Sequence, residues 1–107
     1  MKQNYFAAYL ANFLTVYLPD MKNVSKNTIL SYCDTFKLFL EYCTQQRGLS
    51  VEKLNMQDMN ATLIEGFLDW LECTRNSSAS TRNQRMGAIR SFIRYVGIND
   101  PRRIHEY

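Results

Sequence analysis

Residues 80–97, STRNQRMGAIRSFIRYVG, indicate the fold most directly. Apolar residues recur in this stretch at intervals of three and four, which is the repeat of one face of an α-helix. A helical wheel gathers four of them on one side: Met86, Ile89, Ile93 and Val96. We therefore expect an amphipathic helix that opens at Ser80 or Thr81 and ends at Gly97. Thr81 and Gln84 have the spacing of a capping box.

The same wheel separates a polar stripe from the apolar face, and its members are Asn83, Gly87, Arg90 and Arg94. Guanidinium groups match phosphate oxygens, and a glycine lets a partner approach the backbone closely. The stripe is therefore consistent with phosphate contact. A polar face that meets only solvent would have the same pattern.

Three further segments show the helical repeat. The first covers about residues 5–17 and should stop before Pro19. The second follows Ser25, a plausible N-cap, and runs to about Gln46, with Gly48 as its stop.

The third segment covers the residues around 63–71 and has two candidate caps. Asn60 is one of them, and Thr62 with Glu65 has capping-box spacing. No stretch alternates apolar and polar residues over the length of a strand, so the sequence predicts an all-α, four-helix fold.

The length of 107 residues suits one compact domain, and no apolar run approaches the roughly 20 residues that span a bilayer. Residues 1–98 are predicted to form that domain. The first residues lack the pattern of an export signal, so we expect a cytoplasmic protein without a membrane partner.

The cysteines Cys33, Cys43 and Cys73 are odd in number, and none forms a CxxC pair. Buried free thiols are the favoured interpretation, ahead of a zinc site or a disulfide. We expect no metal, no cofactor and no small-molecule substrate, because neither a metal-ligand set nor a glycine loop for phosphates is present.

Positive charge is segregated along the chain, although the net charge is only +3. Five acids face a single lysine between residues 51 and 72, whereas seven arginines face two acids from residue 75 onward. This distribution favours a polyanionic partner for the C-terminal half.

Polar and basic residues gather at the starts of two predicted helices. The fourth opens with Ser80, Thr81, Arg82, Asn83, Gln84 and Arg85, and the second has Lys26, Asn27, Thr28 and Ser31 in its first turns. The free N–H groups of a helix start favour an anion, and Asn, Gln and Arg side chains can read base edges. Capping alone would explain the hydroxyls and Gln84, but not Arg82, Asn83 and Arg85.

At this level of detail the chain resembles the SAM-like core-binding domain of tyrosine recombinases, the phage integrase family. The residues that carry the resemblance lie in "VSKNTILSYCDTFKLFLEYC", "SASTRNQRMGAIRSFIRYV" and "INDPRRI". The resemblance implies two helical hairpins crossed roughly at right angles, which form half of a clamp on a recombination site. Residues 99–107 would then begin a linker to a catalytic domain that is absent here.

The resemblance also implies the residues that touch double-stranded DNA. They are Lys26, Asn27, Thr28, Ser31, Ser80, Thr81, Arg82, Asn83, Gln84 and Arg85, with Arg90 as a further phosphate contact. It further implies neighbouring recombinase protomers as partners, which the first helix could contact through Tyr5 and Tyr9.

No catalytic residue is expected in this chain. The family cleaves and rejoins DNA with arginines, a lysine, histidine-type residues and a nucleophilic tyrosine in the following domain. His105 and Tyr107 fall in the predicted linker, so we interpret both as linker residues.

A helical protein–protein interaction module without a DNA role is the alternative. Many aromatic residues and the acidic third helix beside the basic fourth favour it, because such a charge-split domain could associate head to tail. An autonomous enzyme has little support, since no paired acid and base is apparent.

Overall fold

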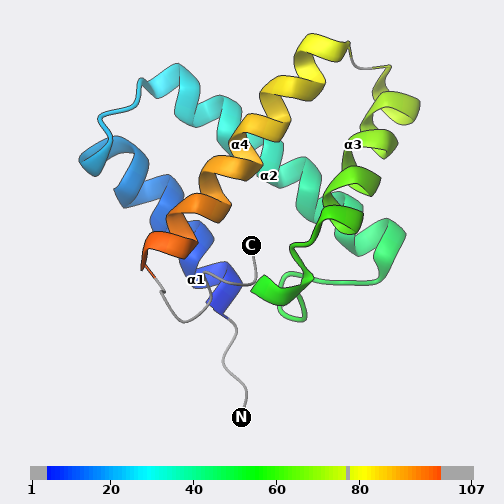
Figure 1. The fold of residues 1–107 in the computed structure, drawn as a ribbon, viewed down its shortest axis with the longest axis horizontal. Coiled ribbons are helices and arrows are strands. Elements are labelled where there is room, and N and C mark those ends of the chain that lie inside the picture. Colours follow the sequence, from blue (N-terminus) through cyan, green and yellow to red (C-terminus); the bar gives the residue numbers. More distant parts are fainter. Residues whose placement is uncertain (1–4, 77, 100–107) are drawn as a thin grey trace. The chain divides into compact units, whose positions relative to one another are not determined.

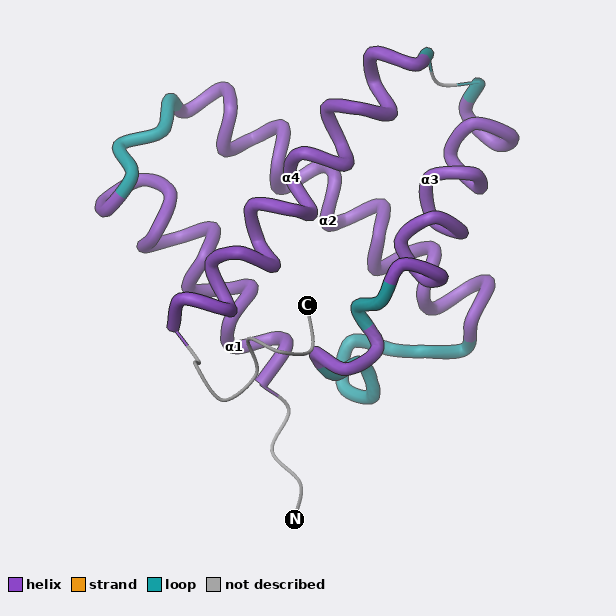
Figure 2. The backbone as a smooth tube through the Cα atoms, viewed as in Figure 1, coloured by secondary structure: helices purple, strands orange, loops and turns teal. Residues whose placement is uncertain are grey.

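Every regular element of the described residues is a helix (Figures 1 and 2). The computed structural model describes residues 5–76 and 78–99. The chain divides into two compact units, Met1–Met56 and Gln57–Tyr107, and each is described by itself. Each unit contains a helical hairpin, so the all-α, four-helix prediction is confirmed. The right-angle crossing of the two hairpins stays a prediction.

The first helix does not stop before Pro19, as the sequence had suggested. α1 (Tyr5–Asn12) continues directly into a π-helix, η1 (Phe13–Met21), which contains Pro19. A proline ring clashes with the carbonyl four residues earlier in an α-helix. The wider π-helical turn changes this spacing, and the Lys22 N–H accordingly donates to the Tyr17 oxygen five residues back, at 2.9 Å. The chain therefore passes the proline without ending the helix.

Aromatic rings close the first hairpin. Phe13 of η1 is fully buried and stacks on Tyr32 of α2 (Lys26–Arg47), with a distance of 6.2 Å between ring centroids. It also meets the edge of Phe36 at 6.3 Å and stacks on Tyr17 at 5.9 Å. Such ring pairs contribute beyond the area that they bury.

Both predicted ends of α2 are confirmed. The Ser25 side chain accepts a hydrogen bond from the Thr28 N–H at 3.2 Å, as an N-cap should. Gly48 follows the last helical residue with φ 65°, the left-handed conformation that glycine adopts without strain.

The second unit starts around a short 3-10 turn, η2 (Met56–Asp58), and contains α3 (Ala61–Arg75) and α4 (Ala79–Asn99). Asn60 is the N-cap of α3, because its side-chain oxygen accepts from the Leu63 N–H at 2.9 Å. The alternative cap at Thr62 was wrong, since Thr62 already lies within the helix. α3 therefore starts at Ala61, the residue after its cap Asn60.

α4 starts earlier and ends later than predicted. The Ser78 hydroxyl accepts from the Thr81 N–H at 3.1 Å, so Ser78 caps the helix and the expected start at Ser80 or Thr81 was wrong. A capping box of Thr81 and Gln84 is excluded because both residues already lie inside the helix. The helix also continues through Gly97 to Asn99, since a glycine within a helix is tolerated where packing supports it. Gly97 is itself buried.

The core of the second unit is aliphatic and aromatic, and its fully buried side chains include Phe67, Leu68, Ile89, Phe92 and Val96. Of the predicted apolar face of the fourth helix, Ile89 and Val96 are buried as expected, whereas Met86 and Ile93 are only half-buried. Most of the predicted linker, residues 99–107, lies outside the described residues. The boundary between a domain of residues 1–98 and a linker of residues 99–107 stays a prediction.

The three cysteines are free thiols, but they differ in exposure. Cys43 is buried, Cys33 is half-buried and Cys73 is exposed, so the prediction of buried thiols was wrong for Cys73. Within the described residues no cluster of three or more acidic, histidine or cysteine side chains could hold a metal ion. Among those residues, no helix is long and apolar enough to cross a membrane.

Candidate nucleic-acid interface

The start of α2 presents a basic and polar surface. Lys26, Asn27 and Thr28 are exposed in its first turn, and Ser31 is half-buried. The Ser25 hydroxyl donates to the Thr28 oxygen at 2.9 Å, which fixes both hydroxyls at the helix end. No acidic residue occupies this first turn, so nothing there offsets the positive end of the helix dipole.

The start of α4 repeats this arrangement with different cations. Its Ser78 hydroxyl donates to the Thr81 oxygen at 3.1 Å, and the first turn again lacks an acid. Three of the predicted site residues in this part of α4 are exposed and three are half-buried: Ser80, Asn83 and Gln84 are exposed, and Thr81, Arg82 and Arg85 are half-buried.

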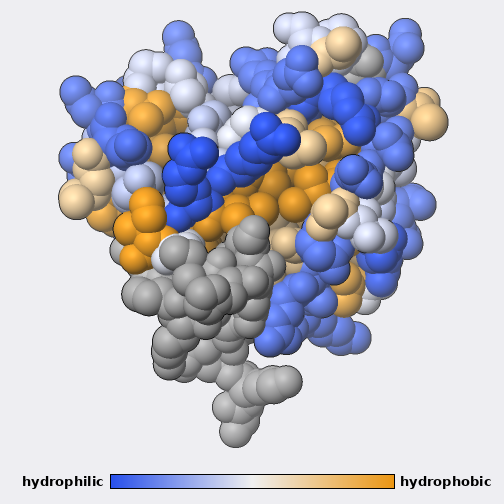
Figure 3. Space-filling view, viewed as in Figure 1, coloured by the Kyte–Doolittle hydropathy of each residue, from blue (hydrophilic) through white to orange (hydrophobic). Residues whose placement is uncertain are grey.

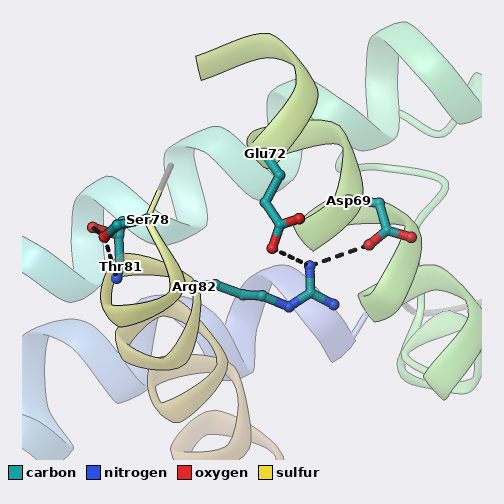
Figure 4. A network of polar contacts seen from close by, with 5 residues as sticks. All are labelled: Asp69, Glu72, Ser78, Thr81 and Arg82. Carbon is teal, nitrogen blue, oxygen red and sulfur yellow. Dashed lines mark hydrogen bonds and ion pairs between the residues drawn. The ribbon is translucent and has the colours of Figure 1, made fainter. Parts of the chain in front are cut away.

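Arg82 is tied to α3 by two ion pairs (Figure 4). Its Nη1 donates to Asp69 Oδ1 at 3.1 Å and to Glu72 Oε1 at 2.9 Å. The pKa of Arg82 is raised above its ordinary value, and the largest cause is the hydrogen bond to Asp69. Burial lowers this pKa, whereas Glu72 raises it further. The guanidinium therefore stays charged and bridges the end of α3 to the start of α4.

Sequence reasoning missed both acidic partners. It recognised an acidic third helix and a basic fourth helix, and Asp69 and Glu72 stand three residues apart, on one face of α3. That spacing, together with an antiparallel hairpin, was the signal that could have identified the pairing. Arg82 thus has a structural role that is distinct from helix capping, because it joins α3 to α4.

The polar stripe of α4 is exposed as the wheel predicted. Asn83, Gly87, Arg90 and Arg94 all face solvent, and a Cβ placed on Gly87 would meet nothing within 4 Å. Within the described part of the chain, neither Arg90 nor Arg94 makes an ion pair. Figure 3 shows strongly hydrophilic side chains following α4 across the face in view. The stripe is thus open to an anionic partner.

The predicted site residues therefore form two clusters. Those from Ser80 to Arg90 share one helix of the second unit, and those from Lys26 to Ser31 share the first two turns of α2 in the first unit. The joint surface expected from the two helix starts stays a prediction.

An apolar groove of about 760 Å³ lies within the second unit. Its lining includes Met59 and Ile64 on one side and Met86, Ile93 and Ile98 on α4, with Arg90 and Arg94 at the same wall. Ile98 is 63% exposed. This groove is the feature of the second unit that best suits a protein partner.

Comparison with known proteins identifies the family of this chain. A family model described as "Phage integrase, N-terminal SAM-like domain" matches residues 10–96. A Sinorhizobium fredii protein named "Putative integrase/recombinase y4rC" is 36% identical over 95 residues, which cover 89% of this chain and 29% of that protein. A second protein of the same organism, "Putative integrase/recombinase y4rD", is 32% identical over 95 residues, or 89% of this chain and 34% of that protein.

The chain thus spans about a third of the length of the curated relatives that it matches. No solved structure matches it significantly.

Proposed function

This chain belongs to the phage integrase family as an N-terminal SAM-like domain, and from that premise we propose that it grips double-stranded DNA for an integrase or recombinase. The grip would come from the starts of α2 and α4 and from the polar stripe of α4. The chain would act as one half of a clamp on a recombination site.

The observation that carries the proposal is the exposed stripe of α4. Asn83 and Arg94 stand eleven residues apart, which is about 16 Å along a helix. The major groove of DNA is about 12 Å wide, so such a stripe is long enough to reach both of its rims. Arg90 and Arg94 would then bind phosphates, and Gly87 would let the helix backbone come close.

Sequence reading would fall to the start of α4. Asn83 and Gln84 are exposed amides of the type that pairs bidentately with adenine, and Arg85 is of the type that pairs with guanine. Ser80 and Thr81 would contact phosphates near the helix end, where the N–H groups favour anions. From the first unit, Lys26, Asn27, Thr28 and Ser31 would add a second set of backbone contacts.

Strand cleavage and rejoining would belong to other parts of a longer tyrosine recombinase. The matched relatives are about three times longer than this chain, and their names place them among integrases and recombinases. Neighbouring protomers on the same DNA would be the protein partners. The proposed DNA-binding function would be carried out in the cytoplasm, without a small-molecule or membrane partner.

Binding of a fluorescent random-sequence duplex, followed by anisotropy across a range of salt concentrations, tests the proposal. The variant Arg90→Ala/Arg94→Ala should bind more weakly, and the slope of log K against log salt should fall by about 2 because two phosphate contacts are lost. The matched control Lys37→Ala/Arg47→Ala removes two exposed cations from α2 and should leave the slope unchanged. An equal change in both variants would show only a general charge effect.

An amide-shift titration with the same duplex locates the surface. We expect shifts at Lys26–Ser31 and at Ser80–Arg85 that fade as salt rises. No shift and no anisotropy change at low salt would rule out the DNA-binding function.

The groove of the second unit supports a different function, that of a protein-interaction module. The charge split that first suggested head-to-tail association is partly neutralised within the chain, because Arg82 pairs with Asp69 and Glu72. Sedimentation at high concentration separates the two functions. Self-association that Ile98→Ser abolishes, without any DNA binding, would favour the interaction module.

A further inference from the structure

The ion pairs of Arg82 use only one of its three guanidinium nitrogens. Nη1 donates both of its hydrogens, one to Asp69 and one to Glu72. In Figure 4, Nη1 lies on the side of the guanidinium that faces the two acids, and the other two nitrogens lie on the opposite side. Within the described residues, Nε and Nη2 make no hydrogen bond.

The edge formed by Nε and Nη2 is one of the two guanidinium edges that can bind two oxygens of a phosphate at once, and it does not use Nη1. An arginine that is free in solvent must give up side-chain freedom to present this edge to a phosphate. The cost is considerable because a long arginine side chain loses much rotamer entropy when it is fixed. Arg82 has already lost much of that freedom in its bonds to α3. Its side chain as a whole is 29% exposed, so a partner can reach part of it.

We propose that Asp69 and Glu72 are positioning residues, which hold Arg82 so that its Nε–Nη2 edge receives a phosphodiester of the DNA backbone. This inference rests on the proposed DNA-binding function and adds to it a preorganised phosphate site at the start of α4. Arg82 would touch the phosphate, whereas the two acids would act only through Arg82. Arg90, which makes no ion pair within the described residues, would bind phosphate without such preparation.

The negative charges of Asp69 and Glu72 repel a phosphate, so the strength of this repulsion has to be considered. The side chains of Asp69 and Glu72 are 69% and 43% exposed. Charges in water interact about twenty times more weakly than in a dry protein interior, and salt screens them further. The repulsion across the guanidinium is thereby reduced, while the geometric constraint on Arg82 remains.

The test compares the same substitution at a positioned and at an unpositioned arginine. Lysine keeps the charge but has no planar fork, so Arg82→Lys should weaken duplex binding about fivefold, and Arg90→Lys by less than about twofold. In the background Asp69→Asn/Glu72→Gln, the cost of Arg82→Lys should fall to that of Arg90→Lys. The general gain in affinity from removing two acids cancels, because each comparison is made within one background.

An unchanged cost of Arg82→Lys in the two backgrounds would overturn the positioning role. Circular dichroism of each variant checks that the helices remain, and Asp69→Asn alone offers a milder background if the double variant loses its fold. Its expected result is an intermediate cost of Arg82→Lys.

Side-chain NMR gives a readout that a purely structural ion pair would not move. The Nε–H signal of Arg82 should be rigid in the free chain, unlike those of Arg90 and Arg94, and it should shift when duplex is added. Amide shifts along α4 without a shift of the Arg82 Nε–H would leave the DNA-binding function standing and reject this inference. No shift anywhere would reject the DNA-binding function itself.

Discussion

Both hairpins bury an apolar core, and they differ in the contacts that strengthen it. In the first, Phe13 is fully buried against Tyr17, Tyr32 and Phe36, with ring centroids 5.9 to 6.3 Å apart. In the second, an arginine at the start of α4 reaches across to two exposed acids of α3. Ring packing involves no charges that salt can screen, whereas exposed ion pairs are screened by it. The start of α4, one of the two helix starts that would meet DNA phosphates, thus also responds to the ionic environment.

The largest expected effect is a loss of stability when the buried ring of Phe13 is removed from the first hairpin. Phe13→Ala should lower the free energy of unfolding by about 3–5 kcal/mol, because it removes a fully buried ring and leaves a cavity. Urea denaturation measures the loss. Val16→Ala, in the same π-helix but 41% exposed, is the matched control and should cost much less. Similar losses in the two variants would mean that the ring stack does not close the hairpin.

The next effect tests the shared capping chemistry of the two hairpins. Ser25→Ala and Ser78→Ala should each cost about 1 kcal/mol, since each removes the acceptor for a threonine N–H. Ser80→Ala lies two residues beyond the cap of α4 and should change stability by less than about 0.5 kcal/mol. Thermal melts of the three variants decide the matter. A larger loss at Ser80 than at Ser78 would place the start of α4 where the sequence had suggested.

Two glycines should respond to alanine with opposite signs. Gly48→Ala forces a side chain into a left-handed conformation with φ 65° and should cost about 1 kcal/mol. Gly87→Ala, inside α4 with open space around the added Cβ, should gain about 0.5–1 kcal/mol. If the backbone at Gly87 approaches DNA, this stabilised variant should bind the duplex more weakly. Tighter or equal binding would remove Gly87 from the interface.

The smallest effect concerns the ion pairs between α3 and α4 in the second hairpin. Arg82→Gln should make the amides at the end of α3 and the start of α4 exchange faster at low salt, with little difference from the parent chain near 1 M salt. Because the pKa of Arg82 is raised, its contribution is complete below the ordinary arginine pKa and disappears only as pH rises through the raised value. This protection should therefore not change between about pH 7 and about pH 10. Equal exchange at all salt concentrations would show that the ion pairs do not hold the hairpin tip.

Much of the fold followed from local chemistry in the sequence. The cap at Ser25 and the stop at Gly48 depend on residues within one turn of the helix end, so the sequence alone identifies them. The exposed stripe of α4 followed in the same way from helical periodicity. Cap choice was harder where serines and threonines are crowded, as between Ser78 and Thr81, because several of these residues could cap equally well.

The errors arose where distant or unusual geometry decides. Pro19 was expected to end an α-helix, but it lies inside a π-helix. No simple periodicity of apolar residues predicts this wider turn. The pairing of Arg82 with Asp69 depends on how α3 and α4 meet, which spacing along one helix does not reveal. The DNA-contact residues themselves came from the family resemblance and from helix-end chemistry, and they remain predictions that the experiments above test.

The π-helix also bears on how chains of this family should be aligned. Within η1, the buried Phe13 and Leu18 are five residues apart, and so are the exposed Val16 and Met21. A relative with one residue fewer in this stretch could form an ordinary α-helix and still bury the same face. Insertions and deletions of a single residue would thus be absorbed inside the helix, leaving the turn before Ser25 and the start of α2 where they are. An alignment that forces such length changes into the turn would assign the wrong residues to the core.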